Sequence, residues 1–258
     1  MKISIITTAY NCEKFIEKSI NSILSQTYED FEFIIVDDGS TDNTVDIIRS
    51  FNDKRITWIS FDHNLGIPSR ANFAIDFAKG EYIAIHDADD ISLPTRLEQE
   101  VKMLNSDKSL FCVGGYAIII NEDGLRMKEW NHPPNSNSGM INVIASGKNP
   151  IINPSAMFKR DDFNKIGKYT TEKDIQLVHD LEFWGRCLFS GLNFCTLETP
   201  LVKYRINRNG LTFGRSSEMR KSHQTLLKRW REKGLILVKV RVRVGNRSDL
   251  DLGLNMKK

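Results

Sequence analysis

The sequence IAIHDADD, residues 83–90, places three carboxylates within four residues at the end of a short apolar run. Such a run is typical of a buried β-strand, and ligands of open α/β sheets bind at the carboxyl ends of the strands. Carboxylates crowded there repel one another and resist full ionisation unless a cation shares their charge. Because Mg²⁺ and Mn²⁺ prefer oxygen ligands, the stretch favours a divalent-metal site. The alternative is a solvated acidic turn that caps a helix starting near Ser92 and Pro94.

Two earlier apolar runs also end in polar residues. Residues 31–36 lead into the sequence DDGS, and residues 3–8 lead into AYN. A segment with apolar residues at helical spacing follows each of them, residues 55–61 and 110–120 read as further strands, and residues 68–79 read as a helix. This alternation predicts a parallel sheet whose right-handed crossovers bring the strand ends to one edge.

A series of short blocks follows in order along the chain. The blocks are TTAYN (7–11), SILSQTY (22–28), VDDGSTDNT (36–44), NLGIPSRAN (64–72), AKGEYIAIHDADD (78–90), PTRL (94–97), NPIINPSAMFKR (149–160), GKY (167–169), HDLEFWGR (179–186) and LVKYR (201–205). In order and rough spacing they resemble the inverting family 2 glycosyltransferases, enzymes with the GT-A fold. The resemblance covers about residues 1–213.

The resemblance implies an α/β fold of the GT-A (Rossmann-like) type, with a mostly parallel central sheet flanked by helices and a basic C-terminal helical appendage. The GT-A domain would span residues 1–214, with a nucleotide-sugar binding half (1–120) and an acceptor-side half (121–214), and residues 215–258 would form the basic tail. The implied reaction moves a sugar from a nucleotide diphosphate-sugar, foremost a UDP-sugar, to an acceptor hydroxyl with inversion. The implied setting is surface polysaccharide synthesis (O-antigen, capsule or exopolysaccharide) on a glycan or lipid-linked glycan acceptor.

Four residues would hold the nucleotide. By resemblance, these are Thr8, Tyr10, Asp38 and Arg70, at positions that recognise the uracil end of the donor in similar enzymes. A uracil offers an imide N–H to a carboxylate and carbonyl oxygens to an arginine, and a tyrosine ring can stack on it. Other roles stay open, because Tyr10 could pack at a strand end, Arg70 could be a surface charge and Asp38 could cap a helix.

The acidic run supplies the predicted metal ligand. Transfer leaves negative charge on the departing nucleotide diphosphate, and a divalent cation can neutralise it. Asp89, the second acid of the family's D-x-D motif, is the predicted ligand of Mn²⁺ or Mg²⁺. Asp87 is predicted to face either the ribose or the metal, and Asp90 to act on the site indirectly.

Inversion requires a base on the face of the sugar opposite the leaving group. A carboxylate can take the proton of the acceptor hydroxyl as attack proceeds. Asp180 in the block HDLEFWGR matches the Asp that similar enzymes use, and Glu182 is the alternative. His179 would either tune Asp180 through a hydrogen bond or cap the helix that follows.

Some positions depart from the family's pattern. Asn207 stands where many relatives have a His in the closing loop, and Asn153 replaces a frequent His. Arg205 or Arg208 could instead stabilise the departing phosphates. Gly210 and Gly214 bracket a segment that could hinge over the donor.

Two other classes of function share some of these features. A nucleotidyltransferase would usually carry a Gly-rich phosphate loop with a basic residue after the first strand, but residues 7–15 (TTAYNCEKF) contain no glycine. A non-catalytic nucleotide-sugar binding protein would not need to keep both Asp89 and Asp180. Metal-dependent release of UDP, with and without acceptor, distinguishes the three.

Composition limits the setting of the protein. A chain of 258 residues can bury one α/β core, and its four cysteines lack paired or metal-type spacing, which favours a reducing compartment. No signal peptide is visible, and no apolar run approaches the roughly 20 residues that span a bilayer. We therefore expect a cytoplasmic protein, with peripheral contact at the inner face of the cell membrane as an extension of that expectation.

Charge is concentrated at the C-terminus. Residues 215–258 carry thirteen Lys or Arg against four Asp or Glu, a balance of +9, which leaves −6 for residues 1–214 of a chain with net charge +3. Apolar residues from Leu226 to Leu237 lie among these charges, so a helix at an anionic membrane surface is one interpretation. A helix packed on the catalytic domain and a partner contact are the others. The membrane interpretation predicts that a chain cut after Gly214 stays folded; nucleic-acid binding is not expected, since no such module is visible.

Overall fold

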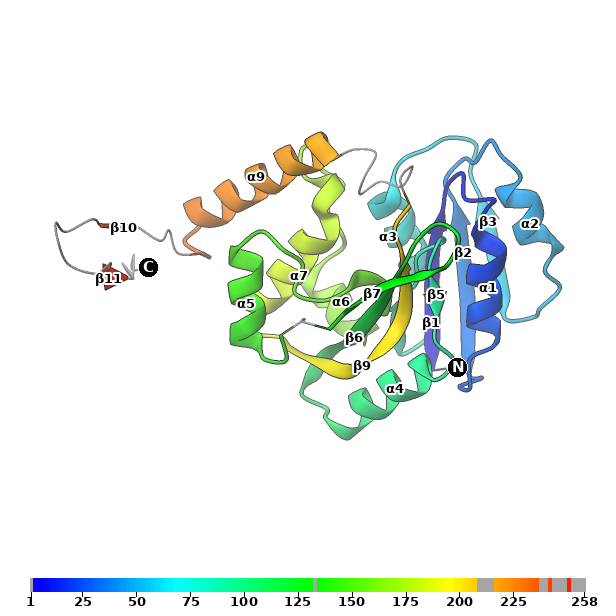
Figure 1. Ribbon diagram of the computed structural model, residues 1–258, viewed down its shortest axis with the longest axis horizontal. Helices are drawn as coiled ribbons and strands as arrows, with labels where there is room; N and C mark the ends of the chain where they lie inside the picture. The colour runs from blue at the N-terminus through cyan, green and yellow to red at the C-terminus, as the bar shows by residue number, and fades with distance from the viewer. Residues whose placement is uncertain (1, 132–133, 208–215, 237–240, 243–249, 252–258) are drawn as a thin grey trace.

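The computed structural model describes residues 2–131, 134–207, 216–236, 241–242 and 250–251. Its first half is the predicted parallel sheet, in the order β3-β2-β1-β4. The strands are β1 (Ile3–Ala9), β2 (Phe31–Asp37), β3 (Ile56–Ser60) and β4 (Tyr82–Ile85). All of them run parallel, so their carboxyl ends lie at one edge (Figure 1). The α/β fold and the strand positions expected from the sequence are confirmed.

Helices cover both faces of this sheet. They are α1 (Ile16–Leu24), α2 (Thr44–Ser50), α3 (Ile67–Phe77) and α4 (Arg96–Ser106). Because side chains alternate along a strand, Ile5 of β1 packs in one core cluster with α1 and α4, while Ile6 packs in the other with α3. A strand that is apolar on both faces is thus buried between two layers of helices.

The second half extends the sheet with mixed pairing. It contributes β5 (Ile91–Ser92), β6 (Leu110–Ile120), β7 (Arg126–Trp130), β8 (Met157–Lys159) and β9 (Asn193–Arg205). β8 enters antiparallel between β4 and β6, whereas β9 runs parallel to β6 and antiparallel to β5. The β9–β5 pairing brings the end of β9 beside the acidic run.

Three helices and two 3₁₀ turns cover this half. They are α5 (Asn137–Ala145), α6 (Arg160–Ile166), α7 (His179–Phe189), η1 (Asn153–Ser155) and η2 (Gln176–Val178). Their apolar faces join the α3 side of the sheet in one core cluster. In that cluster Phe158, Phe163 and Phe183 contact one another through their rings.

The helix α9 (Ser216–Glu232) begins the predicted tail and packs on the catalytic core (Figure 1). Leu226 and Trp230 are buried, and the Trp230 ring lies so close to Gly185 of α7 that a Cβ there would come within 2.4 Å of it. Arg229 pairs with Glu172 and with Asp174 in the segment before α7. Among the three interpretations of residues 216–236, the packing helix is the one that the structure shows.

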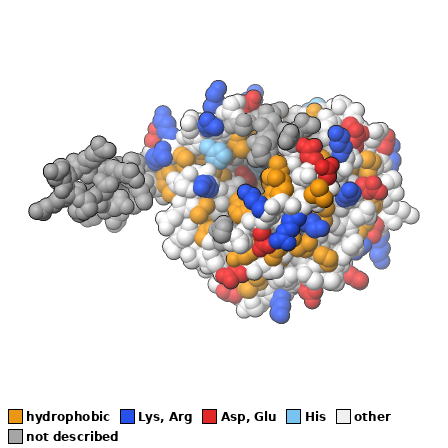
Figure 2. All heavy atoms as spheres, in the orientation of Figure 1, with side chains coloured by type: hydrophobic (Ala, Val, Ile, Leu, Met, Phe, Trp, Pro, Cys, Tyr) orange, Lys and Arg blue, Asp and Glu red, His pale blue; other side chains and the backbone are white. Residues whose placement is uncertain are grey.

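The burial of α9 removes part of the apolar set that was expected to face a membrane. Leu226 and Trp230 are covered by protein and cannot face a membrane, although Leu235 is partly exposed. Leu237, the last member of the apolar set, lies outside the described residues. Among the residues that the structure describes, no helix is long and apolar enough to cross a bilayer. Figure 2 shows both acidic and basic side chains on the face it presents.

Candidate active site

The acidic run forms a tight, buried loop directly after β4. The side chains of Asp87 and Asp89 are partly buried, and Asp90 is buried. Burial, reinforced by the charges of Asp89 and Asp180, raises the pKa of Asp87 to about 7. Burial raises the pKa of Asp89 and, together with the charge of Asp87, that of Asp90. These carboxyls lie in a region that opposes their ionisation.

A buried polar network supports this loop from below. Ser19 of α1 hydrogen-bonds to Nε2 of His86 at 2.8 Å and donates to the carbonyl oxygen of Asp87 at 3.1 Å. Ser92 contacts Nδ1 of His86 at 3.3 Å and accepts a hydrogen bond from Arg96. Burial, with Arg96 nearby, lowers the pKa of His86 to about 3, so this imidazole is neutral at physiological pH.

Arg205, at the end of β9, ties the loop to the second half of the molecule. Its backbone N–H donates to Oδ1 of Asp90 at 2.7 Å, and its Nε donates to the carbonyl oxygen of Asp89 at 2.7 Å. Its Nη1 reaches the carbonyl oxygens of Asn121 and Glu122 after β6. The guanidinium is therefore engaged with backbone carbonyls through Nε and Nη1, and its suggested role with the departing phosphates stays a prediction. Arg208, the other candidate, lies outside the described residues.

Asn207 follows Arg205 and contacts the predicted metal ligand. Its Nδ2 lies 3.4 Å from Oδ2 of Asp89. The residue that replaces the family's common His thus still faces the acidic loop. The proposed hinge residues Gly210 and Gly214 lie outside the described residues.

The predicted nucleotide residues lie along the same edge of the sheet. Asp38, directly after β2, accepts hydrogen bonds from the backbone N–H groups of Leu65 and Gly66, both at 2.8 Å, and from Nε of Arg70 at 2.6 Å. Asp38 and Arg70 are both buried, and the Arg70 guanidinium stacks 3.6 Å from the centre of the Phe61 ring. The pair fixes the 63–66 turn beside the sheet edge.

Thr8 and Tyr10 stand at the end of β1. Thr8 is partly buried and pairs with Val36 in the register of β1 and β2. Tyr10 is 50% exposed, and Asn11 after it has a positive φ of 46°. The side chain of Asn11 accepts a hydrogen bond from the N–H of Thr41, which holds the two loops together. The exposed Tyr10 ring is available to stack on a planar ligand.

Asp180 lies in the first turn of α7, across from the acidic loop. Its negative charge contributes to the raised pKa of Asp87, so the two carboxyls share one region. Asp180 accepts hydrogen bonds from Nδ2 of Asn149 at 2.6 Å and from the N–H of Leu181 at 2.8 Å. Glu182, the alternative base, instead forms two 2.9 Å hydrogen bonds with Arg186, which favours Asp180.

The chemistry of this site fits a divalent cation held together with a ligand. Oδ2 of Asp90 is buried and has no hydrogen-bond partner in the part of the chain that the structure describes. Crowded, desolvated carboxyls such as Asp87 and Asp89 would be stabilised in their charged form by a cation. No group of three His, Cys, Asp or Glu within the described residues could hold a metal by itself. A cation here would need oxygens from a substrate diphosphate, as Mg²⁺ sites commonly do.

Several contributors to the site have no signature in the sequence. Asn149 sits inside a block that carried the family resemblance, but nothing in its spacing indicates a bond to Asp180. His86 and Arg96 are part of the quoted motifs, yet their buried network depends on Ser19 of another helix. For Asn149, His86 and Arg96, the sequence offered no signal other than their position within the quoted motifs.

A parallel sheet whose carboxyl edge carries an acidic loop opposite a second carboxylate is the arrangement expected of a GT-A glycosyltransferase. Residues 4–167 match the family model described as Glycosyl transferase family 2, and the chain belongs to that family.

Two curated relatives cover most of the chain. An uncharacterised glycosyltransferase of Methanocaldococcus jannaschii is 35% identical over 236 residues, which is 90% of this chain and 80% of the relative. The UDP-Glc:alpha-D-GlcNAc-diphosphoundecaprenol beta-1,3-glucosyltransferase WfaP of Escherichia coli is 30% identical over 218 residues, 84% of this chain and 82% of the relative.

Solved structures share the fold. TarS of S. aureus, in complex with UDP, has a TM-score of 0.66 and 20% identity, covering 81% of this chain and 62% of its own. The mannosyltransferase PcManGT from Pyrobaculum calidifontis, in complex with GDP-Man and Mn²⁺, has a TM-score of 0.67 and 21% identity, covering 88% of this chain and 64% of its own. At this level of identity, the similarity establishes the GT-A fold alone.

Proposed function

We propose that this glycosyltransferase moves a sugar from a nucleotide diphosphate-sugar, foremost a UDP-sugar, to an acceptor hydroxyl with inversion. The observation that carries the proposal is the convergence of the acidic loop and Asp180 at the carboxyl edge of the sheet. It places groups suited to a diphosphate and a carboxylate suited to a base in one region. The UDP complex of TarS and the UDP-Glc donor in the name of WfaP support the choice of nucleotide.

The residues divide into three roles. Thr8, Tyr10, Asp38 and Arg70 hold the base and ribose, and Asp87 would face the ribose or the metal. Asp89 would hold Mn²⁺ or Mg²⁺, a cation that would neutralise charge on the departing diphosphate. Asp38 and Arg70 already bond to each other, so they offer the nucleotide a rigid surface whose geometry is fixed before binding.

Asp180 acts as the base. It takes the proton of the acceptor hydroxyl while the acceptor oxygen forms a bond to the anomeric carbon and the bond to the diphosphate breaks. Because attack and departure occur on opposite faces of the sugar, the configuration inverts. The partial exposure of Asp180 leaves it accessible to an acceptor.

We place the reaction in surface polysaccharide synthesis on a glycan or lipid-linked glycan, at the inner face of the cell membrane. The acceptor printed in the name of WfaP, a GlcNAc-diphosphoundecaprenol, supports this class of acceptor. The relative TuaG of Bacillus subtilis, 30% identical over 213 residues, bears the name of a teichuronic acid biosynthesis glycosyltransferase.

A donor panel tests the function. UDP-glucose, UDP-GlcNAc and GDP-mannose are each added with Mn²⁺, and thermal stabilisation and nucleotide release are measured with GlcNAc-diphosphoundecaprenol in detergent. Stabilisation and turnover with a UDP-sugar are expected. The absence of both with every donor would refute the proposal, and a product of retained configuration would refute inversion.

Replacing the base provides the first prediction. Asp180→Asn should keep donor binding, because the amide has the same shape, but lose transfer by at least about 10²-fold because it cannot accept the proton. Glu182→Gln is the matched control in the same helix, and it should keep transfer within about tenfold because Glu182 bonds to Arg186. Near-normal transfer by Asp180→Asn would exclude Asp180 as the base.

A further inference from the structure

Asn149 holds the carboxylate of Asp180 from outside its helix. Nδ2 of Asn149 donates a 2.6 Å hydrogen bond to one carboxylate oxygen of Asp180, and the N–H of Leu181 donates to the other at 2.8 Å. Each oxygen therefore has one protein donor. Two donors that approach from different segments restrict rotation of the carboxylate about its last bond.

The amide of Asn149 has a buried oxygen that stabilises nothing. Its Oδ1 is buried and has no hydrogen-bond partner in the described part of the chain. The amide cannot turn over, because the carboxylate of Asp180 accepts hydrogen bonds and would repel an oxygen. A buried carbonyl without a partner lowers stability, and a leucine of similar size would avoid that cost. Folding stability thus does not explain an asparagine at this position.

The loop that carries Asn149 is rigidly anchored. Ile151 is buried so closely against Gly114 of β6 that a Cβ on that glycine would lie 2.6 Å from the Ile151 side chain. Ser155 donates to the carbonyl oxygen of Ile152 at 2.7 Å and also contacts the backbone of Gly115. The backbone next to Asn149 is thus fixed to the central sheet rather than to α7, which carries Asp180.

We propose that Asn149 is a positioning residue that orients the carboxylate of Asp180 toward the acceptor hydroxyl. The inference rests on the proposed function, in which Asp180 is the base. Asn149 exchanges no proton; it fixes which carboxylate oxygen faces the substrate while the hydroxyl proton passes to Asp180. Loss of this orientation lowers the rate of the chemical step and leaves donor binding intact, because misplacement of a reacting group acts on the transition state.

The test combines stability and kinetics in one variant. Asn149→Leu should unfold at the wild-type temperature or above it, because the unpaired oxygen is gone and water can reach Asp180. Its kcat, measured as nucleotide release with the donor panel and GlcNAc-diphosphoundecaprenol, should fall about 10- to 100-fold with the donor KM unchanged. Lys148→Ala, an exposed neighbouring residue, should match the wild type in both measurements.

A double-mutant cycle shows whether Asn149 acts through Asp180. In an Asp180→Asn background, Asn149→Leu should cause no further loss of kcat, because the group that it orients is already disabled. Additive losses, or a wild-type kcat in Asn149→Leu while Asp180→Asn is impaired, would refute the positioning role alone. A normal rate in Asp180→Asn would instead refute the proposed function.

A measurement without substrate tests the geometry directly. Crystal structures of the wild type and of Asn149→Leu should show the Asp180 carboxylate in one orientation in the former and in a different or divided orientation in the latter. An unchanged carboxylate in the variant would overturn the proposal whatever donor the enzyme uses. A variant with strongly reduced unfolding temperature would also overturn it, because Asn149 would then be needed for folding.

Discussion

Asp87 and Asp53 lie at opposite edges of the same parallel sheet, in opposite electrostatic settings. Asp87 follows β4 at the carboxyl edge, where burial and neighbouring acids raise its pKa to about 7. Asp53 precedes β3 at the amino edge, where hydrogen bonds from Arg55 lower its pKa to about 2. Asp53 is thus paired with a base within the protein, whereas Asp87 lies among other carboxyls that oppose its ionisation.

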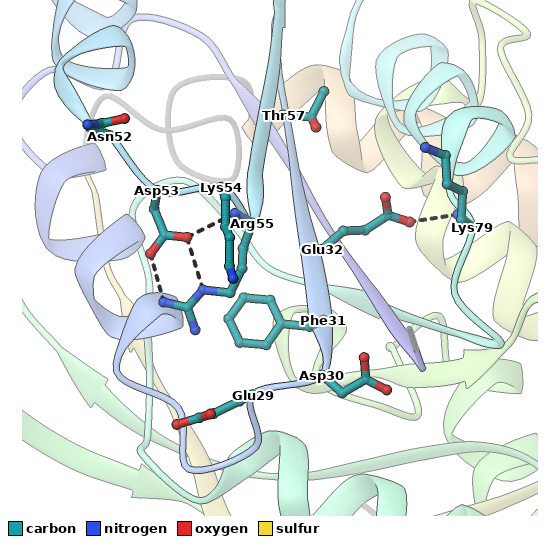
Figure 3. A pocket seen from close by; sticks show the side chains of 10 residues that line it. All are labelled: Glu29, Asp30, Phe31, Glu32, Asn52, Asp53, Lys54, Arg55, Thr57 and Lys79. Carbon is teal, nitrogen blue, oxygen red and sulfur yellow. Dashed lines mark hydrogen bonds and ion pairs between the residues drawn. The ribbon is translucent and has the colours of Figure 1, made fainter.

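Figure 3 shows the hollow at the amino edge, which Asp53 and Arg55 line. Asp53 accepts hydrogen bonds there from the backbone N–H, Nε and Nη2 of Arg55 (Figure 3). Glu32 accepts hydrogen bonds from the N–H of Lys79 and the hydroxyl of Ser4. The central carboxylates of this hollow, Asp53 and Glu32, are thus already hydrogen-bonded within the protein. Unpaired, desolvated carboxyls therefore mark the candidate site better than the shape of the surface does.

The largest expected effect comes from a comparison of one substitution at each edge of the sheet. Asp89→Ala should abolish Mn²⁺-dependent binding of UDP while the fold persists, because it removes the predicted cation ligand. Asp53→Ala, at the amino edge, should bind UDP and Mn²⁺ like the wild type. Calorimetric titration of both proteins measures the difference, and wild-type affinity in Asp89→Ala would remove Asp89 from the metal site.

The helix α7, whose first turn carries Asp180, packs closely against Trp230 of α9. Trp230→Ala should lower the free energy of unfolding by about 3–5 kcal/mol, the range for truncating a buried aromatic side chain. Denaturant unfolding measures it. Leu235→Ala, a partly exposed residue just beyond α9, is the control and should change stability by no more than about 0.5 kcal/mol. Equal stability of Trp230→Ala and the wild type would restore the expectation that a chain cut after Gly214 stays folded.

Lowering the pH should reduce the stabilising contribution of His86, which supports the acidic loop. Its pKa is about 3 in the folded protein, against 6.5 for an unperturbed histidine, so between these pH values the unfolded chain binds more protons. The contribution of His86 to stability therefore falls as pH drops from about 6.5 toward 3, by up to about 1.4 kcal/mol per pH unit for one proton.

The contribution of His86 is isolated by comparison with a variant. Glu100, whose pKa burial raises to about 7, has the opposite effect between pH 4.5 and 7, since there the folded state binds the extra proton. Urea unfolding of the wild type and His86→Asn across pH 3–7 should give a shallower fall in the variant. Parallel curves would show that His86 is protonated alike in both states.

The smallest effect is expected at the amino edge. Asp53→Asn should lower stability by at most about 1 kcal/mol, since the ion pair with Arg55 is partly solvated. The folded pKa of Asp53 is depressed, so this stability is present above pH 4 and is lost as pH falls through about 2. Thermal unfolding at pH 7 and pH 2 should show the larger difference at pH 7. A loss well above about 1 kcal/mol would mean that the Asp53–Arg55 pair contributes more than a partly solvated ion pair does.

Local patterns were enough to locate the first four strands and the acidic loop. Apolar runs of four to seven residues such as 31–36 bury both faces, and a strand-to-helix alternation leaves few parallel arrangements. The order of the family's blocks added the candidate base Asp180. The hydrogen bond from Asn149 to Asp180 could not be predicted, because a contact between residues 31 positions apart leaves no periodic pattern in the sequence.

The sequence by itself determined the α/β alternation, the carboxylates after β4 and the family, since each depends on neighbouring residues or on the order of short motifs. Only the tertiary structure decided that Arg205 binds the acidic loop and that the apolar face of α9 lies on α7. The physical reason is the same in each case. An arginine or an amphipathic helix has several possible partners of equal chemistry, and only the packing of distant segments selects one of them.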